Sequence, residues 1–140
     1  MGVRYMLHTG HLSGLQSTLR RAVGQYSRSN AFLYVGVTTC PPIRWSHAVG
    51  GHKTRGMDEM VLMYQTTSRD YAIEAERALI AHGRLQYAFR LLNKAPGGEG
   101  VRYDRPHYYV YVAVWNFPPE ASEEQVLQAL VAKMVMSLSE

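Results

Sequence analysis

The sequence predicts an α+β domain, in which a small mixed or antiparallel sheet of three to four strands is flanked by helices. Three segments rich in aromatic and β-branched residues have the composition of strands, at residues 31–38, 59–66 and 107–115. Other segments place apolar residues at helical spacing, at residues 12–26, 67–82 and after residue 118. A length of 140 residues suits one compact domain of this class.

The first half of the chain predicts strand, helix, strand, helix. Residues 3–8 are a short candidate strand. Residues 12–26 form an amphipathic helix whose polar face bears Arg20 and Arg21, and Ser29-Asn30 ends it. After the strand at 31–38, Pro41-Pro42 suits the first turn of a helix, where proline's missing N–H would be unpaired anyway. We expect that helix to end at Gly50-Gly51.

The second half predicts a strand at 59–66 and a long helix at 67–82. Residues 67–70 have the spacing of a capping box at the start of that helix, and Gly83 is expected to end it. A shorter helix over 85–92 and a glycine-rich turn over 96–100 then lead into the strand at 107–115. Ser122 and Gln125 form a second capping box before a final amphipathic helix.

The charge distribution indicates an anionic partner. Residues 1–56 contain no Asp or Glu, and all eleven acidic residues lie from Asp58 onward, although the net charge is only +4. Such asymmetry favours a polyanion at the N-terminal half, with phosphate the leading candidate. The alternative is a surface that is merely basic and soluble.

Composition also indicates in which cellular compartment the protein works. A single cysteine, Cys40, allows no internal disulfide and favours a reducing environment. No signal-peptide core precedes the first strand, and no window approaches the length of a membrane span. We therefore expect an intracellular protein, cytoplasmic or nuclear, with no membrane partner.

Glu76 is the most informative single residue. It lies in the middle of the apolar stripe of the helix at 67–82, between Ala72 and Ile73 on one side and Leu79 and Ile80 on the other. Burying an unpaired carboxylate costs several kcal/mol, so a core-facing Glu needs a cation or a hydrogen-bond partner. A divalent metal is one such partner. The alternatives are an internal salt bridge to an arginine, or a helix whose polar face is wider than this stripe implies.

A second constellation begins at Tyr34-Val35-Gly36. A glycine inside a strand suggests that another group approaches the backbone closely. Arg44 follows on the next helix, and its planar fork of donors suits a phosphate. The alternatives are an ordinary core tyrosine and a surface arginine. Zinc bound by Cys40, His47 and His52 is a weaker reading of the same region, because three ligands at loose spacing are a poor signal.

Together these residues resemble the second half of the signature of GIY-YIG nucleases. The matching positions run in order along residues 32–94, and they are Tyr34, Gly36, Thr38, Arg44, His47, Gly50, Gly51, Ala72, Glu76 and Asn93. On this resemblance we divide the domain into a basic helical extension (1–30), a GIY-YIG-like nuclease core (31–116) and a C-terminal amphipathic helix (117–140).

The resemblance implies metal-dependent hydrolysis of DNA, including branched DNA. Glu76 would hold one Mg²⁺ or Mn²⁺, Arg44 would neutralise the scissile phosphate, and Tyr34, helped by His47, would activate the attacking water. Asn93 would orient neighbouring groups.

The basic residues outside the core of the signature would contact the DNA backbone, and these are Arg20, Arg21, Lys53 and Arg55. Two alternatives remain open: a non-catalytic nucleic-acid-binding module on the same fold, and an interaction domain that forms a homodimer through the C-terminal helix.

The first half of the signature is missing from its usual place. The Gly-Ile-Tyr tripeptide should end a strand about ten residues before Tyr34, but Gly24-Gln25-Tyr26 falls in a predicted helix. We expect the strand at 107–115 to pair beside the Tyr34 strand instead. The missing tyrosine would then be Tyr108, Tyr109 or Tyr111.

Overall fold

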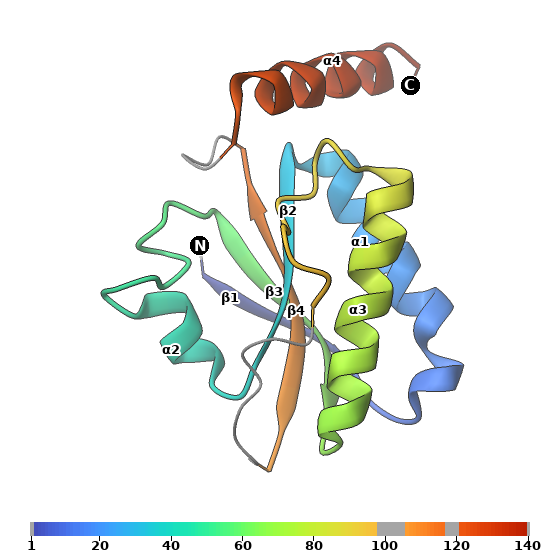
Figure 1. Cartoon of the computed structure of the whole chain (residues 1–140), viewed down its shortest axis with the longest axis vertical. Coiled ribbons are helices and arrows are strands. Elements are labelled where there is room, and N and C mark those ends of the chain that lie inside the picture. The colour runs from blue at the N-terminus through green and yellow to red at the C-terminus, as the bar shows by residue number, and fades with distance from the viewer. Residues whose placement is uncertain (1, 98–105, 117–120, 140) are drawn as a thin grey trace.

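The protein has the α+β fold that its sequence predicts. The structure, a computed structural model, describes residues 2–97, 106–116 and 121–139. A turn of 3-10 helix at Leu12–Gly14 precedes α1. The elements in chain order are β1 (Val3–His8), α1 (Gln16–Ser29), β2 (Phe32–Thr38), α2 (Pro41–Ser46), β3 (Glu59–Thr66), α3 (Arg69–Gln86), β4 (Tyr108–Trp115) and α4 (Glu123–Ser139) (Figure 1).

The described strands form one mixed sheet in the order β1-β3-β4-β2. β4 runs antiparallel to both of its neighbours, whereas β1 runs parallel to β3. The expectation that the strand at 107–115 pairs beside the Tyr34 strand is therefore confirmed. Residues 1–30 contribute the edge strand β1 as well as α1, so this segment is part of the sheet layer rather than an appendage to it.

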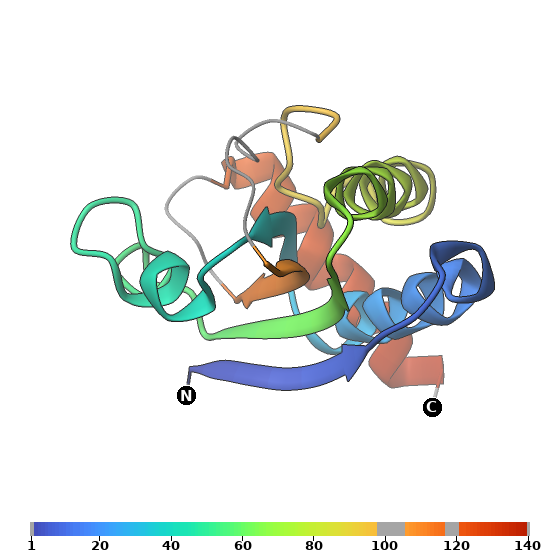
Figure 2. The same ribbon diagram turned by 90° about the horizontal axis from the view of Figure 1, so that it is seen from below.

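Helices cover both faces of the sheet. α1 and α3 lie on one face and α2 on the other, which is clearest when the sheet is seen end-on (Figure 2). The larger core packs α1 and α3 on alternate residues of β2, β3 and β4, including Leu33, Val61 and Val112. The smaller core lies on the α2 face and contains Phe32, Trp45 and Trp115.

Two predictions about α3 and its surroundings are wrong. The helix continues through Gly83 to Gln86, because this glycine is a packing position: a Cβ there would lie 2.9 Å from the ring of Tyr87. No separate helix forms over 85–92. That segment instead runs beside β2, where Leu91 makes a parallel bridge to Leu33.

The structure confirms both predicted capping motifs, although the cap of α3 is one residue later than predicted. Ser68, not Thr67, caps α3 by accepting a hydrogen bond from the backbone N–H of Tyr71 at 3.1 Å. The capping box of Ser122 and Gln125 is confirmed, with both of its hydrogen bonds at 3.1 Å. α2 ends at Ser46, before the predicted Gly50-Gly51. Residues 98–100 of the predicted glycine-rich turn lie outside the described residues.

α4 crosses one end of the sheet and packs on it lightly (Figure 1). Ala129 is buried in the smaller core, but Leu127 and Met134 are 63% and 65% exposed. None of the helices in the described part of the chain is long and apolar enough to cross a membrane.

Candidate functional site

The β2–β4 register places Tyr111 opposite Gly36. The tyrosine ring lies across the glycine so closely that a Cβ on Gly36 would meet the hydroxyl oxygen at 2.4 Å and Cζ at 2.5 Å. Any larger residue at position 36 would displace the ring. The close approach predicted from a glycine inside a strand is therefore present, and the approaching group is a side chain of the protein itself.

The Tyr111 hydroxyl joins two side chains from the α2 face. Arg44 Nε donates a hydrogen bond to it at 3.1 Å, and His52 Nε2 lies 2.7 Å from it. Arg44 comes from α2 and is anchored a second time by donating from Nη1 to the backbone oxygen of Gly50 at 3.1 Å. Tyr111 and His52 are 1% and 0% exposed, so water does not compete for these bonds.

Burial and the neighbouring arginines keep His52 neutral. Burial, together with the smaller effects of the Arg44 and Arg55 charges, lowers the pKa of His52 to about 3. Arg44 donates to the Tyr111 oxygen, which leaves the Tyr111 O–H free to donate to Nε2 of the neutral imidazole. In that tautomer Nδ1 carries the ring proton, and Nδ1 is buried without a hydrogen-bond partner among the described residues.

Tyr34 completes this group of side chains, which we call the Tyr34–Arg44 cluster (Tyr34, Arg44, His52 and Tyr111). The centroid of the Tyr34 ring lies 5.6 Å from that of His52 and 6.5 Å from that of Tyr111. Burial by itself lowers the pKa of Arg44, but Tyr111 and then Tyr34 outweigh it and raise that pKa. Tyr34 and Arg44 are half-buried, so they are the members of the cluster that can touch a ligand.

Glu76 reaches the cluster electrostatically from the other face of the sheet. It is 6% exposed on α3, and its carboxylate lies close to Gly97, where an added Cβ would be 3.1 Å from Oε1. Burial raises the pKa of Tyr111, Arg44 lowers it, and Tyr34 and Glu76 raise it further, for a net increase. The predicted burial of Glu76 is thus confirmed, and its charge acts on the hydroxyl that Arg44 and His52 hold.

Asn93 fixes the outer edge of β2 beside the cluster. Its amide accepts from the backbone N–H of Val35 and donates to the backbone oxygen of Val35, both at 2.8 Å. Two further backbone bonds tie Leu33 to the segment that follows α3, also at 2.8 Å. The asparagine therefore pairs with the residue between Tyr34 and Gly36 as a neighbouring strand would, and it orients that tripeptide rather than touching a ligand.

His47 lies apart from the Tyr111 hydroxyl. Its ring is exposed, and Nδ1 lies 3.1 Å from the backbone nitrogen of Val49 and 2.9 Å from its oxygen, so it caps its own turn. His52, considered from the sequence only as a zinc ligand, holds the hydroxyl instead. In the described part of the chain no three His, Cys, Asp or Glu side chains converge as a metal site, so the structure does not bring Cys40, His47 and His52 together as zinc ligands.

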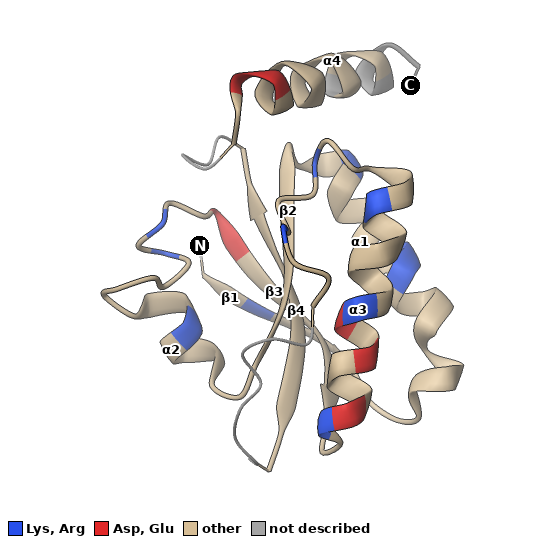
Figure 3. Ribbon diagram, viewed as in Figure 1, with Lys and Arg blue, Asp and Glu red and all other residues tan. Residues whose placement is uncertain are grey.

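The predicted DNA-contacting residues fall in two separate places. Lys53 is exposed in the loop after α2, and Arg55 in the same loop stacks over Trp115, with 5.6 Å from its Cζ to the ring centroid. Arg20 and Arg21 lie on α1, on the other side of the sheet. In the described chain α1, α2 and the loop after α2 as far as Met57 carry only basic charges, whereas the acidic side chains gather mainly on α3 and at the start of α4 (Figure 3).

The sequence left three candidates for the tyrosine beside Gly36, namely Tyr108, Tyr109 and Tyr111. Strand alternation puts Tyr109 and Tyr111 on the face of Gly36 and Tyr34, which excludes Tyr108. The register against Gly36 then selects Tyr111. Comparison of the chain with protein-family models, with curated proteins and with solved structures gives no match.

Proposed function

We propose that the chain is a divalent-metal-dependent endonuclease that hydrolyses DNA phosphodiester bonds at the Tyr34–Arg44 cluster. The observation that carries the proposal is the Tyr111 hydroxyl, held between Arg44 Nε at 3.1 Å and His52 Nε2 at 2.7 Å directly over Gly36. Tyr34 lies close enough to Arg44 to raise its pKa, and these two half-buried side chains are the members of the cluster open to a ligand. The resemblance of Tyr34, Arg44, Glu76 and Asn93 to the GIY-YIG signature supports the same reading.

Arg44 is the group that would receive the scissile phosphate. Two of its nitrogens are engaged by Tyr111 and Gly50, which fixes the plane of the guanidinium and leaves further N–H donors for phosphate oxygens. A fixed donor aimed at developing negative charge stabilises a transition state without reorganising. Tyr111 and His52 are buried, so in this proposal they are positioning residues for Arg44.

Tyr34 would orient the attacking water by accepting a hydrogen bond from it, and the proton that the water loses would pass to solvent. The phosphate would also change His52, because a bound anion offsets the Arg44 charge that lowers the His52 pKa. His52 would then become a better acceptor for the Tyr111 proton once substrate is bound. The cluster would thus gain proton affinity when the phosphate arrives.

In this proposal the Glu76 carboxylate is the protein ligand for one divalent cation. Mg²⁺ is commonly bound by one or two carboxylates together with water and substrate phosphate oxygens, and Glu76 supplies one buried carboxylate. Such an ion, when bound, would stabilise charge on the leaving oxygen. Glu76 would hold it, while Arg44 and Tyr34 act on the phosphate and the water.

Cleavage assays test the proposal. The protein is incubated with branched and linear DNA in Mg²⁺, in Mn²⁺ and in EDTA, beside Arg44→Ala and Tyr34→Phe. We expect metal-dependent cutting that falls by about 10²–10³ in Arg44→Ala, the usual effect of removing one transition-state donor. Arg84→Ala is the matched control, since Arg84 is exposed on α3 away from the cluster.

Two outcomes would replace the proposal. DNA binding by the protein without cutting of any substrate would indicate the non-catalytic nucleic-acid-binding module. Cutting that is unchanged in both Arg44→Ala and Tyr34→Phe would place the active site elsewhere.

A further inference from the structure

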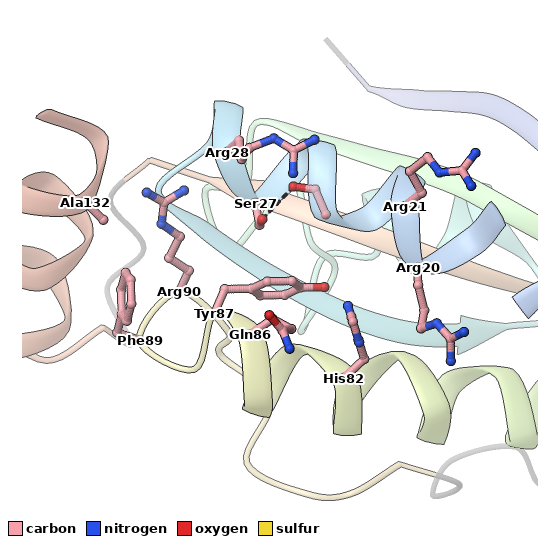
Figure 4. Close-up of a pocket in the computed structure, with 11 residues that line it drawn as sticks. Arg20, Arg21, Ser27, Arg28, His82, Gln86, Tyr87, Phe89, Arg90 and Ala132 are labelled. Carbon is pink, nitrogen blue, oxygen red and sulfur yellow. Dashed lines mark hydrogen bonds between the residues drawn. The ribbon is translucent and has the colours of Figure 1, made fainter. Parts of the chain in front are cut away.

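A second basic site lies on the face of the sheet opposite the Tyr34–Arg44 cluster. It is a cavity of about 510 Å³ between α1, the end of α3 and α4. Arg20, Arg21 and Arg28 reach it from α1, and Arg90 reaches it from the segment after α3 (Figure 4). Its volume lies within the range of about 300–1,000 Å³ that is usual for small-molecule sites.

The charge in this cavity is unbalanced. No Asp or Glu lines it, and among the described residues none of these four arginines is ion-paired with a carboxylate. Arg90 is 3% exposed, and burial lowers its pKa. Burying an unpaired guanidinium lowers the free energy of unfolding, because the charge loses its hydration. An anion bound in the cavity would offset this desolvation cost.

The cavity also holds buried donors without partners. Among the described residues, Arg90 Nε and the Tyr87 hydroxyl are buried with no hydrogen-bond partner. The Tyr87 ring extends between α1 and α3, with Arg28 and Arg90 toward the α4 side and Arg20 toward the opposite end (Figure 4). Its hydroxyl therefore points toward the Arg20 end of the cavity, away from the Arg90 guanidinium.

Aromatic rings accompany the cations. Tyr87 and His82 make an edge contact with 6.2 Å between ring centroids, and Phe89 lies under the Arg90 guanidinium at 5.8 Å. Arginines with aromatic faces form the surface that stacks bases and binds phosphates in single-stranded nucleic-acid sites. A simple anion such as chloride would use the charge but not the rings.

We propose that this cavity is a nucleotide-binding site, separate from the Tyr34–Arg44 cluster, in which Arg28 and Arg90 bind the phosphate group at the α4 end and the Tyr87 hydroxyl donates to the sugar or base further along the cavity. The nucleotide is either free or one unit of a nucleic-acid strand that continues past the cluster. The site does not depend on catalysis at the cluster.

Isothermal titration calorimetry with dAMP and with a single-stranded oligonucleotide tests the site. Both titrations are made in EDTA at low salt, with Arg44→Ala as the background so that cutting plays no part. Tyr87→Phe changes no charge and removes a hydroxyl that has no partner in the fold, so the variant should fold at least as well as its parent. We expect Tyr87→Phe and Arg28→Ala each to weaken binding about tenfold or more, while Arg84→Ala leaves it unchanged.

The two probes separate the sources of the nucleotide. Binding of dAMP that both variants weaken indicates a free nucleotide, and an effect on the oligonucleotide alone indicates a strand that continues past the cluster. The proposal is overturned if neither probe binds. It is also overturned if Tyr87→Phe binds both probes as its parent does, since loss in Arg28→Ala alone would then report general surface charge.

Discussion

Replacing Tyr111 by Phe tests the cluster as a structural unit. The substitution removes one oxygen and leaves the ring in place over Gly36. His52 then has no partner at either ring nitrogen among the described residues, and Arg44 Nε loses its acceptor. A buried polar group left unpaired costs about 1–3 kcal/mol.

The expected cost follows from the burial of the two groups. His52 is fully buried and bears the whole penalty, whereas Arg44 is half-buried and recovers part of it from water. We therefore expect Tyr111→Phe to lower the free energy of unfolding by about 2–4 kcal/mol. Urea denaturation measures this as a lower midpoint at constant slope.

Tyr109→Phe is the matched control. Tyr109 lies on the same strand and the same face, and its hydroxyl makes no hydrogen bond with the described residues. A surface-type change of this kind is expected to stay within about 0.5 kcal/mol. Equal effects of the two substitutions would refute the argument that Tyr111 holds Arg44 and His52.

Three further predictions test the surroundings of the cluster. Gly36→Ala should cost about 1–3 kcal/mol by overpacking against the Tyr111 ring, and its cost should shrink in a Tyr111→Ala background; equal costs in both backgrounds would contradict the contact. Asn93→Asp should cost about 1–3 kcal/mol in urea denaturation, because a carboxylate cannot donate to the Val35 oxygen; Asn93→Asp as stable as the parent would show that the edge pairing is dispensable. The low His52 pKa should make stability pH-dependent: the unfolded state binds more protons between the ordinary value of 6.5 and about 3, so the contribution is complete above 6.5 and is lost as pH falls, by up to about tenfold in the folding equilibrium constant per pH unit. The stability difference between the parent and His52→Gln, followed by thermal melts, should therefore fall from pH 7 to pH 4, and a constant difference would mean that His52 titrates normally.

Local sequence signals predicted most of the fold. The strands are rich in β-branched and aromatic residues, and the helices at 12–26 and 67–82 repeat apolar residues at helical spacing. Both patterns are local, so they can be recognised without knowing which segments pack together. The errors lie where tertiary packing decides. Gly83 reads as a helix end, but it is used to admit the Tyr87 ring. The segment over 85–92 has helical composition, yet its backbone pairs with β2.

The site was predictable only where its members are close in sequence. Tyr34, Gly36 and Arg44 share a strand, a turn and a helix, so their spacing carried the signal. Tyr111 lies 67 residues from Arg44 and 59 residues from His52, and only the strand order brings them together. His47 and His52 lie on one loop, and no local pattern distinguishes the histidine that turns inward from the one that stays exposed.

The central claim is that Glu76 and the Tyr34–Arg44 cluster act together on a phosphodiester bond. Glu76→Gln keeps the shape of the side chain and removes its charge, and Glu74→Gln makes the same change at an exposed position on the same helix. With branched DNA and a Mg²⁺ titration, we predict that Glu74→Gln cuts at the parent rate while Glu76→Gln does not cut and still binds DNA. Cutting by Glu76→Gln at the parent rate and with the same Mg²⁺ dependence would contradict the claim.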